Sequence, residues 1–278
     1  MKKVVLSAAA LMIGVIGFAQ NNESTVDQNG NAQESTVYQN GRNQTSNVDQ
    51  LGGDGNNSYV MQHGGGSTST VLQDGSGNES DVAQGIGGVT LGPHKSDVEQ
   101  IGSDNISQVA QDGDGPNTSY VDQLGSEHQS YVEQTGSLAF SSVDQLGGDR
   151  NYSDVYQTGS SSSYVDQIGN DNDSYVTQRG GANNSSLVWQ DGDENISTVN
   201  QNGLAGYPDR GSNNSSEVWQ YGFSHESIVN QSGEYNQSMV TQNGTNQGSN
   251  VKQTGSGNIS TVEQLDHASS RGSYGRTN

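Results

Sequence analysis

One internal repeat dominates the chain: S-x-V-x-Q-x-G, usually preceded by N-x. It first appears at residues 22–30 and occurs in 21 units, most of them 11 or 12 residues apart. In every unit serine lies two residues before the valine and glutamine two after it. Glycine follows the glutamine by two residues except where Ile86 and Asp266 stand. A period this regular indicates an architecture in which each unit packs on its neighbours.

Composition alone would predict a disordered chain rather than a folded one. Only 28% of the 278 residues are hydrophobic, 39 are glycine, and the net charge is −21, which are features of disordered chains. The regularity of the repeat outweighs this argument. The negative charge disfavours a nucleic-acid partner, because an acidic surface repels phosphate. The absence of cysteine excludes a disulfide scaffold and cysteine-ligated metal sites.

Within a unit, serine, valine and glutamine alternate with variable residues, which is the period of a β-strand. The invariant residues therefore share one face, and the glycine supplies a turn in which a positive φ is not penalised. A unit of this length suits one short strand and one tight turn, so two units form a coil of about 22 residues. Coils stacked about 4.8 Å apart predict an all-β fold, namely a β-solenoid of two parallel sheets built from the 21 half-repeats.

Two other folds fit the pattern less well. The chain has no apolar stripe with a helical period, and glycine and β-branched residues recur throughout, which disfavours helices. A three-sided β-helix of the polysaccharide-lyase kind usually needs a wider apolar interior than one valine per strand provides.

The chain is expected to have three segments. Residues 1–19 predict a secretory signal peptide, because Lys2 and Lys3 precede an apolar run and Gly17 and Ala19 occupy the small-residue places of a cleavage site. A membrane anchor is the alternative, but the run is short for a full span. Residues 20–265 predict the solenoid, and residues 266–278 a short polar tail. We therefore expect an exported mature chain without a membrane span.

The invariant polar residues face the interior in this prediction, so each needs a hydrogen-bond partner. Stacking identical residues in register provides one: a glutamine amide can donate to the glutamine one coil away, and asparagine and serine can do likewise or bond the turn backbone. The predicted structural ladder is represented by Ser24, Val26, Gln28, Ser35, Val37, Gln39, Ser153, Val155, Gln157, Ser197, Val199, Gln201, Ser260, Val262 and Gln264. The predicted turn residues are represented by Gly30, Gly41, Gly159 and Gly203.

Both ends of such a stack present an unpaired strand. The strands at residues 22–28 and 258–264 have no further neighbour in the repeat, so the predicted assembly edges are marked by Asn22, Gln28, Asn258 and Gln264. Soluble monomers normally protect such edges with bulges, proline or charge. Because only a short polar tail is available here, we expect end-to-end stacking into a fibre.

The repeat resembles that of the curlin family, the subunits of bacterial curli, an extracellular functional amyloid. The pattern Gln-x-Gly-x-x-Asn-x-Ser-x-Val-x-Gln occurs with regular spacing at residues 190–201 and with one extra turn residue at residues 145–157. The resemblance extends over about residues 22–265. It implies a secreted subunit that polymerises with itself into fibres of the biofilm matrix and functions in adhesion. It also implies a nucleator subunit and an outer-membrane secretion channel as partners.

No catalytic constellation is recognisable. The chain has no nucleophile elbow, P-loop or HExxH motif, and its histidines lack the spacing of zinc ligands. We therefore expect no enzymatic activity, no cofactor and no metal site. The alternative function is a monomeric β-solenoid adhesin whose outer face binds ice, a glycan or a cell surface. Thr25, Thr36 and Thr70 begin the threonine ladder typical of ice binders, but Asp81 and Asp97 interrupt it.

The outward positions leave several interpretations open. The residues that follow the valines of the odd-numbered units are mostly acidic, which predicts either a pH- or cation-sensitive face or a solvated surface that keeps chains apart. Tyrosines that precede the valines form either aromatic ladders or ordinary half-exposed strand positions. Trp189 and Trp219 share one face and are a candidate patch for surfaces or glycans. Two insertions, at residues 85–95 and 203–212, are expected to be loops on one edge of the solenoid, with a partner-binding site as the alternative.

Overall fold

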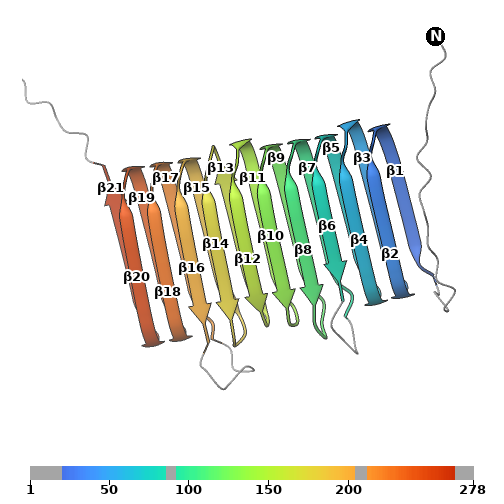
Figure 1. Cartoon of the computed structure of the whole chain (residues 1–278). Coiled ribbons are helices and arrows are strands. Elements are labelled where there is room, and N and C mark those ends of the chain that lie inside the picture. Colours follow the sequence, from blue (N-terminus) through green and yellow to red (C-terminus); the bar gives the residue numbers. More distant parts are fainter. Residues whose placement is uncertain (1–20, 86–91, 204–211, 267–278) are drawn as a thin grey trace, which may run out of the picture.

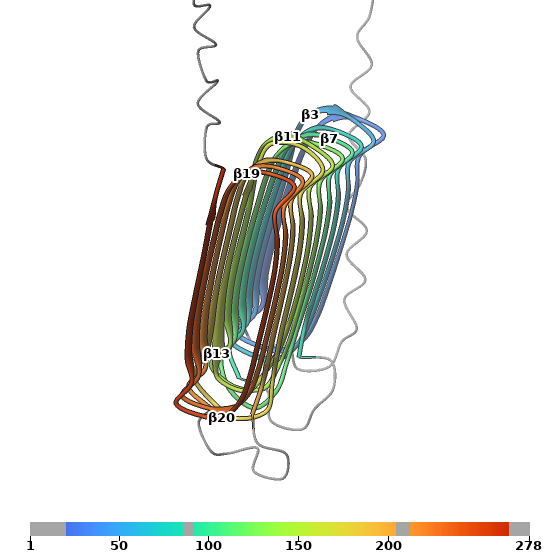
Figure 2. The same ribbon diagram turned by 90° about the vertical axis from the view of Figure 1, so that its left-hand side faces the viewer.

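The computed structural model describes residues 21–85, 92–203 and 212–266, and this part of the chain consists of strands joined by tight turns. The predicted signal peptide lies outside the described residues, as do residues 86–91 and 204–211 of the two insertions and residues 267–278 of the tail. Figure 1 shows the strands as a single stack with β1 at one end and β21 at the other. The coils are flat, and the two sheets face each other closely in the view along the stack (Figure 2).

Odd- and even-numbered strands form separate sheets. In spatial order, the 11-stranded sheet contains β1 (Glu23–Asn31), β3 (Thr45–Asp54), β5 (Thr68–Ser76), β7 (Lys95–Ser103), β9 (Thr118–Ser126), β11 (Phe140–Asp149), β13 (Ser161–Ile168), β15 (Asn184–Asp193), β17 (Ser215–Phe223), β19 (Gln237–Thr245) and β21 (Ile259–Leu265). The 10-stranded sheet contains β2 (Glu34–Arg42), β4 (Asn57–Gly65), β6 (Glu79–Gln84), β8 (Ile106–Asp112), β10 (Gln129–Thr135), β12 (Tyr152–Thr158), β14 (Asp173–Arg179), β16 (Ile196–Asn202), β18 (Glu226–Glu234) and β20 (Gly248–Ser256).

The predicted all-β β-solenoid of two parallel sheets is confirmed. Each coil contributes one strand to each sheet, and neighbouring strands of a sheet are parallel. The register preserves the repeat: between β10 and β12, for example, Val132 lies opposite Val155 and Gln134 opposite Gln157. Serine, valine and glutamine meet their own kind in every pair of strands. A slip of one residue would turn all three to solvent, and a slip of two would break the pairing of identical residues, so the repeat selects this register.

The apolar core is a column of valines between the two sheets. Every valine of this column from β3 to β20 is buried, and none is more than 5% exposed. The valines of the end strands β1, β2 and β21, namely Val26, Val37 and Val262, are only partly buried. The core therefore has no apolar cap at either end of the described stack.

Two turn positions in most units take a positive φ. One is the repeat glycine: at Gly102, with φ +125°, an added Cβ would also collide with the carbonyl oxygen of Gly125 in the next coil. The other lies three residues before the serine and is occupied by 14 non-glycine residues, among them Glu127 (φ 58°) and Arg150 (φ 60°). Sequence reasoning located the first position and missed the second. Seven of the 14 are asparagine or aspartate, and Gly55, Gly66, Gly77 and Gly257 occupy the same position, so residues that tolerate a positive φ mark it in about half of the units.

Candidate assembly interface

Two continuous columns of hydrogen-bonded glutamines run along the interior, one in each sheet. In the 11-stranded sheet the column begins at Gln28, whose Nε2 donates to Oε1 of Gln50 at 2.7 Å, and ends at Gln264. In the 10-stranded sheet it runs from Gln39 to Gln253. All the bonds within both columns measure 2.7–2.9 Å. The columns therefore link every coil of the stack to the next.

The second amide hydrogen of these glutamines crosses to the other sheet. Nε2 of Gln145, for example, donates to the backbone carbonyl oxygen of Gln129 at 3.0 Å, one residue before Ser130. The same bond is made by every glutamine of the two columns except Gln28, which has no preceding strand. Both hydrogens of each buried amide are thus satisfied, one along the stack and one across it.

The glutamine columns have a direction. In both, Nε2 donates toward the C-terminal end of the stack. At the N-terminal end, Oε1 of Gln28 and Oε1 of Gln39 therefore receive no hydrogen bond from the described chain. At the C-terminal end, Gln253 and Gln264 donate one amide hydrogen to a backbone carbonyl, and the hydrogen that elsewhere reaches the next coil has no partner among the described residues. One end presents acceptors and the other presents donors, which suits head-to-tail stacking.

A further pair of columns lies at the corners of the coils, two residues before the serines. Here the side-chain oxygen of asparagine accepts from the backbone N–H of the corner residue in the next coil, as from Asn172 to Oδ1 of Asn151 at 3.0 Å. His128 acts in the same way: its Nδ1 accepts from the N–H of Asn151 at 3.2 Å, and its Nε2 lies 3.4 Å from the carbonyl oxygen of Leu124. Burial lowers the pKa of His128, which favours the neutral ring that this arrangement needs.

The serine column makes no such bonds, contrary to the expectation of a hydrogen-bonded serine ladder. The hydroxyl oxygens of buried serines, Ser130 and Ser153 among them, have no hydrogen-bond partner in the structure. Serine has a single oxygen as both donor and acceptor, so identically oriented serines repeat their oxygens at the strand spacing of about 4.8 Å, beyond hydrogen-bond distance, whereas glutamine has separate donor and acceptor atoms. Each serine before β21 instead directly follows the residue whose backbone carbonyl accepts the cross-sheet hydrogen bond from a glutamine, and its small side chain leaves room for that glutamine.

The other predicted site residues occupy inward faces and turns. The predicted ladder residues of β12 and β16 are buried, whereas those of β1, β2 and β21 are half-buried. Gly30, Gly41 and Gly159 have a positive φ. At Gly203 the constraint is close approach between coils, because an added Cβ would lie 2.6 Å from the carbonyl oxygen of Gly180.

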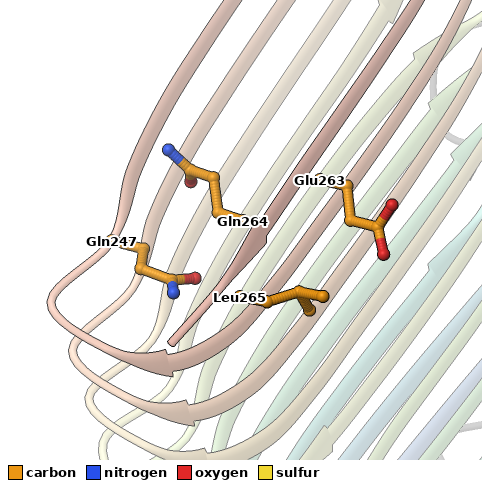
Figure 3. Close-up of a pocket in the computed structure, with 4 residues that line it drawn as sticks. All are labelled: Gln247, Glu263, Gln264 and Leu265. Atoms are coloured by element: carbon orange, nitrogen blue, oxygen red, sulfur yellow. The ribbon is translucent and has the colours of Figure 1, made fainter. Parts of the chain in front are cut away.

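The C-terminal end of the stack is stepped and open. Figure 3 shows Gln264 and Glu263 extending in different directions from β21, with Gln247 at the neighbouring corner. A shallow pocket of about 440 Å³ lies between Gln247, Glu263, Gln264 and Leu265. Glu263 and Leu265 are exposed, and Gln264 is half-buried where every inner glutamine of its column is buried. At this end the described residues therefore leave the interior columns uncovered.

The outer face of the 11-stranded sheet contains a column of acids. Asp122, Asp144 and Asp166 lie next to one another in β9, β11 and β13. Burial and neighbouring carboxylates raise the pKa of Asp122 and of Asp144 to about 6, and burial also raises the pKa of Asp166. A proton shared within the column would relieve its repulsion, which favours the interpretation of a pH-sensitive face over that of a simple solvated surface.

Aromatic side chains form short stacks on both outer faces. In the 10-stranded sheet, the ring of Tyr152 lies 5.7 Å from that of Tyr131 and 5.4 Å from that of Tyr175. In the 11-stranded sheet, the rings of Trp189 and Trp219 are 5.8 Å apart and inclined by 26°. Some of the tyrosines predicted at these positions are therefore members of aromatic ladders.

Within residues 21–85, 92–203 and 212–266, no group of three or more histidine, cysteine, aspartate or glutamate side chains is arranged to hold a metal ion. Nor does this part of the chain contain a helix with the length and hydrophobicity needed to cross a bilayer.

The family model for the curlin associated repeat matches residues 148–180. This segment contains β12, β13 and β14 and their turns. The match confirms the resemblance to the curlin family that the repeat itself indicated. No curated protein matches the chain.

Proposed function

We propose that this chain, which resembles the curlin family, is a secreted structural subunit that assembles end to end into extracellular cross-β fibres. The fibres are curli-like amyloid and serve the biofilm matrix and adhesion. The partner of each subunit is another copy of the same chain. The curlin associated repeat and the solenoid fold point to a structural protein rather than an enzyme.

The state of the two ends is the observation on which the proposal rests. β1 pairs only with β3 and β21 only with β19, so each leaves one row of backbone N–H and C=O groups without a strand partner among the described residues. The inward residues of these strands are the same serine, valine and glutamine found in every inner strand. A second copy would therefore extend columns that already exist, and exposed edges of this kind favour strand addition.

Export and location are part of the same proposal. Residues 1–19 have the composition of a signal peptide, and the matched family is associated with extracellular fibres. Residues 20–265 then constitute the fibre-forming solenoid and residues 266–278 its polar tail. An outer-membrane secretion channel and a nucleator subunit complete the set of proposed partners, as the family resemblance implies.

Incubation of the purified mature chain tests the proposal directly. We expect thioflavin T fluorescence to rise with time, unbranched fibres to form in electron micrographs, and fibre diffraction to show the strand spacing of about 4.8 Å along the fibre axis. Sonicated fibres should remove the lag phase, because new ends are the sites of growth. A chain that stays monodisperse at micromolar concentration for days would contradict the proposal.

One observation favours the alternative of a monomeric surface binder. Trp189, Trp219 and Tyr221 form a continuous aromatic stack on one outer face, with Trp219 and Tyr221 inclined by 17°. Flat aromatic faces of this kind bind sugar rings and other surfaces. A monodisperse chain that binds immobilised polysaccharide, and loses binding in Trp219→Ala, would support this function instead.

A further inference from the structure

The described stack begins and ends in the same sheet. β1 and β21 are the two outer strands of the 11-stranded sheet, whereas β2 and β20 bound the 10-stranded sheet. At each end the 11-stranded sheet therefore extends one strand, or half a coil, beyond the 10-stranded sheet and forms a step. The position that would follow β21 along the coil, next to β20, is empty of any described strand.

Two junctions between copies can be compared. If the next copy is only translated along the stack, its β1 lies on β21, but its β2 is about 9.6 Å from β20, twice the strand spacing, and one strand is missing between them. If the next copy is also rotated by a half-turn about the stack axis, its β1 fits into the step beside β20 and its β2 lies on β21. The half-turn keeps the pairing parallel, because the two strands of a coil run in opposite directions.

We propose that successive copies are related by this half-turn, so that β1 of one copy pairs with β20 of the previous copy and β2 pairs with β21. The inference rests on the proposed end-to-end assembly and specifies its interface. It makes two strand pairs where translation makes one. Both unpaired acceptors, Oε1 of Gln28 and Oε1 of Gln39, then meet the unpaired amide hydrogens of Gln253 and Gln264, and neither glutamine column is interrupted.

The charges on the outer faces select the same junction. Asp27, Lys252 and Glu263 all stand one residue after a valine and are exposed. The half-turn places Asp27 of the next copy beside Lys252, whereas translation places it beside Glu263. An attractive cross-strand pair is thus formed in the first junction and a repulsive one in the second. A groove of about 500 Å³ already lies at this step, and Lys252, Val251 and Val262 are among the residues that line it.

Charge variants at the two candidate positions distinguish the junctions in seeded elongation at low ionic strength. Neither Lys252 nor Glu263 has a charged neighbour in register within its own chain, since they lie opposite Asn230 and Thr241. We expect Lys252→Glu to slow elongation roughly three- to tenfold and Glu263→Lys to change it less than about twofold. Asp27→Lys combined with Lys252→Glu should restore the rate, and these differences should shrink in about 1 M salt.

The opposite pattern would overturn the inference: faster growth in Glu263→Lys together with an unchanged rate in Lys252→Glu indicates the translated junction. The failure of the unmodified chain to form fibres would instead refute the proposed function, on which the junction depends. The two failures are therefore distinguishable in one set of experiments.

A direct readout uses the absence of cysteine from the chain. Asn243→Cys introduces a single thiol on an exposed position of β19, which can be labelled with gold and located in electron micrographs of fibres. The half-turn predicts labels on alternate faces of the fibre, about 50 Å apart along the axis from one copy to the next. Labels that all follow one face would overturn the inference.

Discussion

Nδ1 of His128 accepts a hydrogen bond from the backbone N–H of Asn151 at 3.2 Å, and Asn151 presents its own side-chain oxygen to the N–H of Asn172 at 3.0 Å. Imidazole and amide are thus equivalent members of one corner column. We expect His128→Asn to keep the stability of the chain within about 0.5 kcal/mol. His128→Leu should lower it by about 1–3 kcal/mol, because the buried N–H of Asn151 loses its acceptor. Urea unfolding of the unassembled chain measures both.

Two buried histidines of the corner columns predict a pH dependence: His128, and His94, whose Nδ1 accepts from the N–H of Asn117 at 3.3 Å. Burial lowers the pKa of His94 and of His128 below the ordinary value of 6.5. Below that pH the unfolded chain binds protons that the folded chain does not, so this contribution to stability is complete above 6.5 and is lost as the pH falls. Replacing both histidines by asparagine should remove this contribution. An unchanged pH profile in the double variant would contradict the prediction.

The acidic column predicts the opposite trend in a lower window. The pKa of Asp122 and of Asp144 rises from 3.8 to about 6, so between these values the folded chain binds protons that the unfolded chain does not. This contribution therefore stabilises the fold as the pH falls from 6 to 4 and is lost as it rises through 6. We expect fibre growth to be faster at pH 4–5 than at pH 7. Asp144→Asn should raise the rate at pH 7 and flatten the dependence, and a growth rate independent of pH in the unmodified chain would refute this.

Replacing an interior glutamine should mainly lower the stability of the fold, whereas replacing a terminal glutamine should mainly slow fibre elongation. Gln145→Leu removes the acceptor of Gln123 and leaves Gln167 Oε1 and a backbone carbonyl without donors, so we expect a loss of stability of about 2–5 kcal/mol. Gln28→Leu affects a single internal bond and should cost about 1–2 kcal/mol, yet slow fibre elongation. Equal losses of stability in the two variants would show that the column is not continuous.

Alanine substitutions at two glycines with positive φ can separate the cost of backbone strain from the cost of a steric collision by the added Cβ. An added Cβ meets nothing within 4 Å at Gly147 (φ +70°) but collides with the carbonyl oxygen of Gly125 at Gly102. Gly147→Ala should therefore cost about 1 kcal/mol, the penalty for an L-residue in this conformation. Gly102→Ala should cost several times as much, because two coils must separate. Thermal unfolding of the two variants provides the comparison.

Proline in the last strand should stop growth without unfolding the chain. Parallel strands direct alternate residues to opposite neighbours, and the N–H of Gln237 in β19 donates to the next coil. By the same alternation the N–H of Thr261 in β21 points to the free edge. Thr261→Pro should therefore abolish elongation from the C-terminal end while the monomer remains folded. Met239→Pro, in the same register of β19, removes an internal ladder bond and serves as the destabilised control; undiminished elongation in Thr261→Pro would exclude this edge as the growth site.

The sequence alone determined the strands, their number and their register. Serine, valine and glutamine recur at fixed offsets, and only one alignment places each of them on its own kind in every coil, so the columns and the β-solenoid could be predicted without coordinates. The repeat glycine likewise marked one turn. These features depend on side-chain period and burial, which are properties that can be read along a chain.

Only the tertiary structure decided which columns are bonded and in which direction. A glutamine amide has separate donor and acceptor atoms that together bridge neighbouring coils, whereas serine has a single oxygen, which is why Gln145 bonds Gln167 and the hydroxyl of Ser130 has no partner. The left-handed turn position at residues such as Arg150 is marked only in part by the sequence: asparagine, aspartate or glycine occupies it in about half of the units, and elsewhere backbone closure between the sheets imposes it on other side chains. The polarity of the amide columns, and hence the difference between the two ends, arises from three-dimensional distances that no residue pattern encodes.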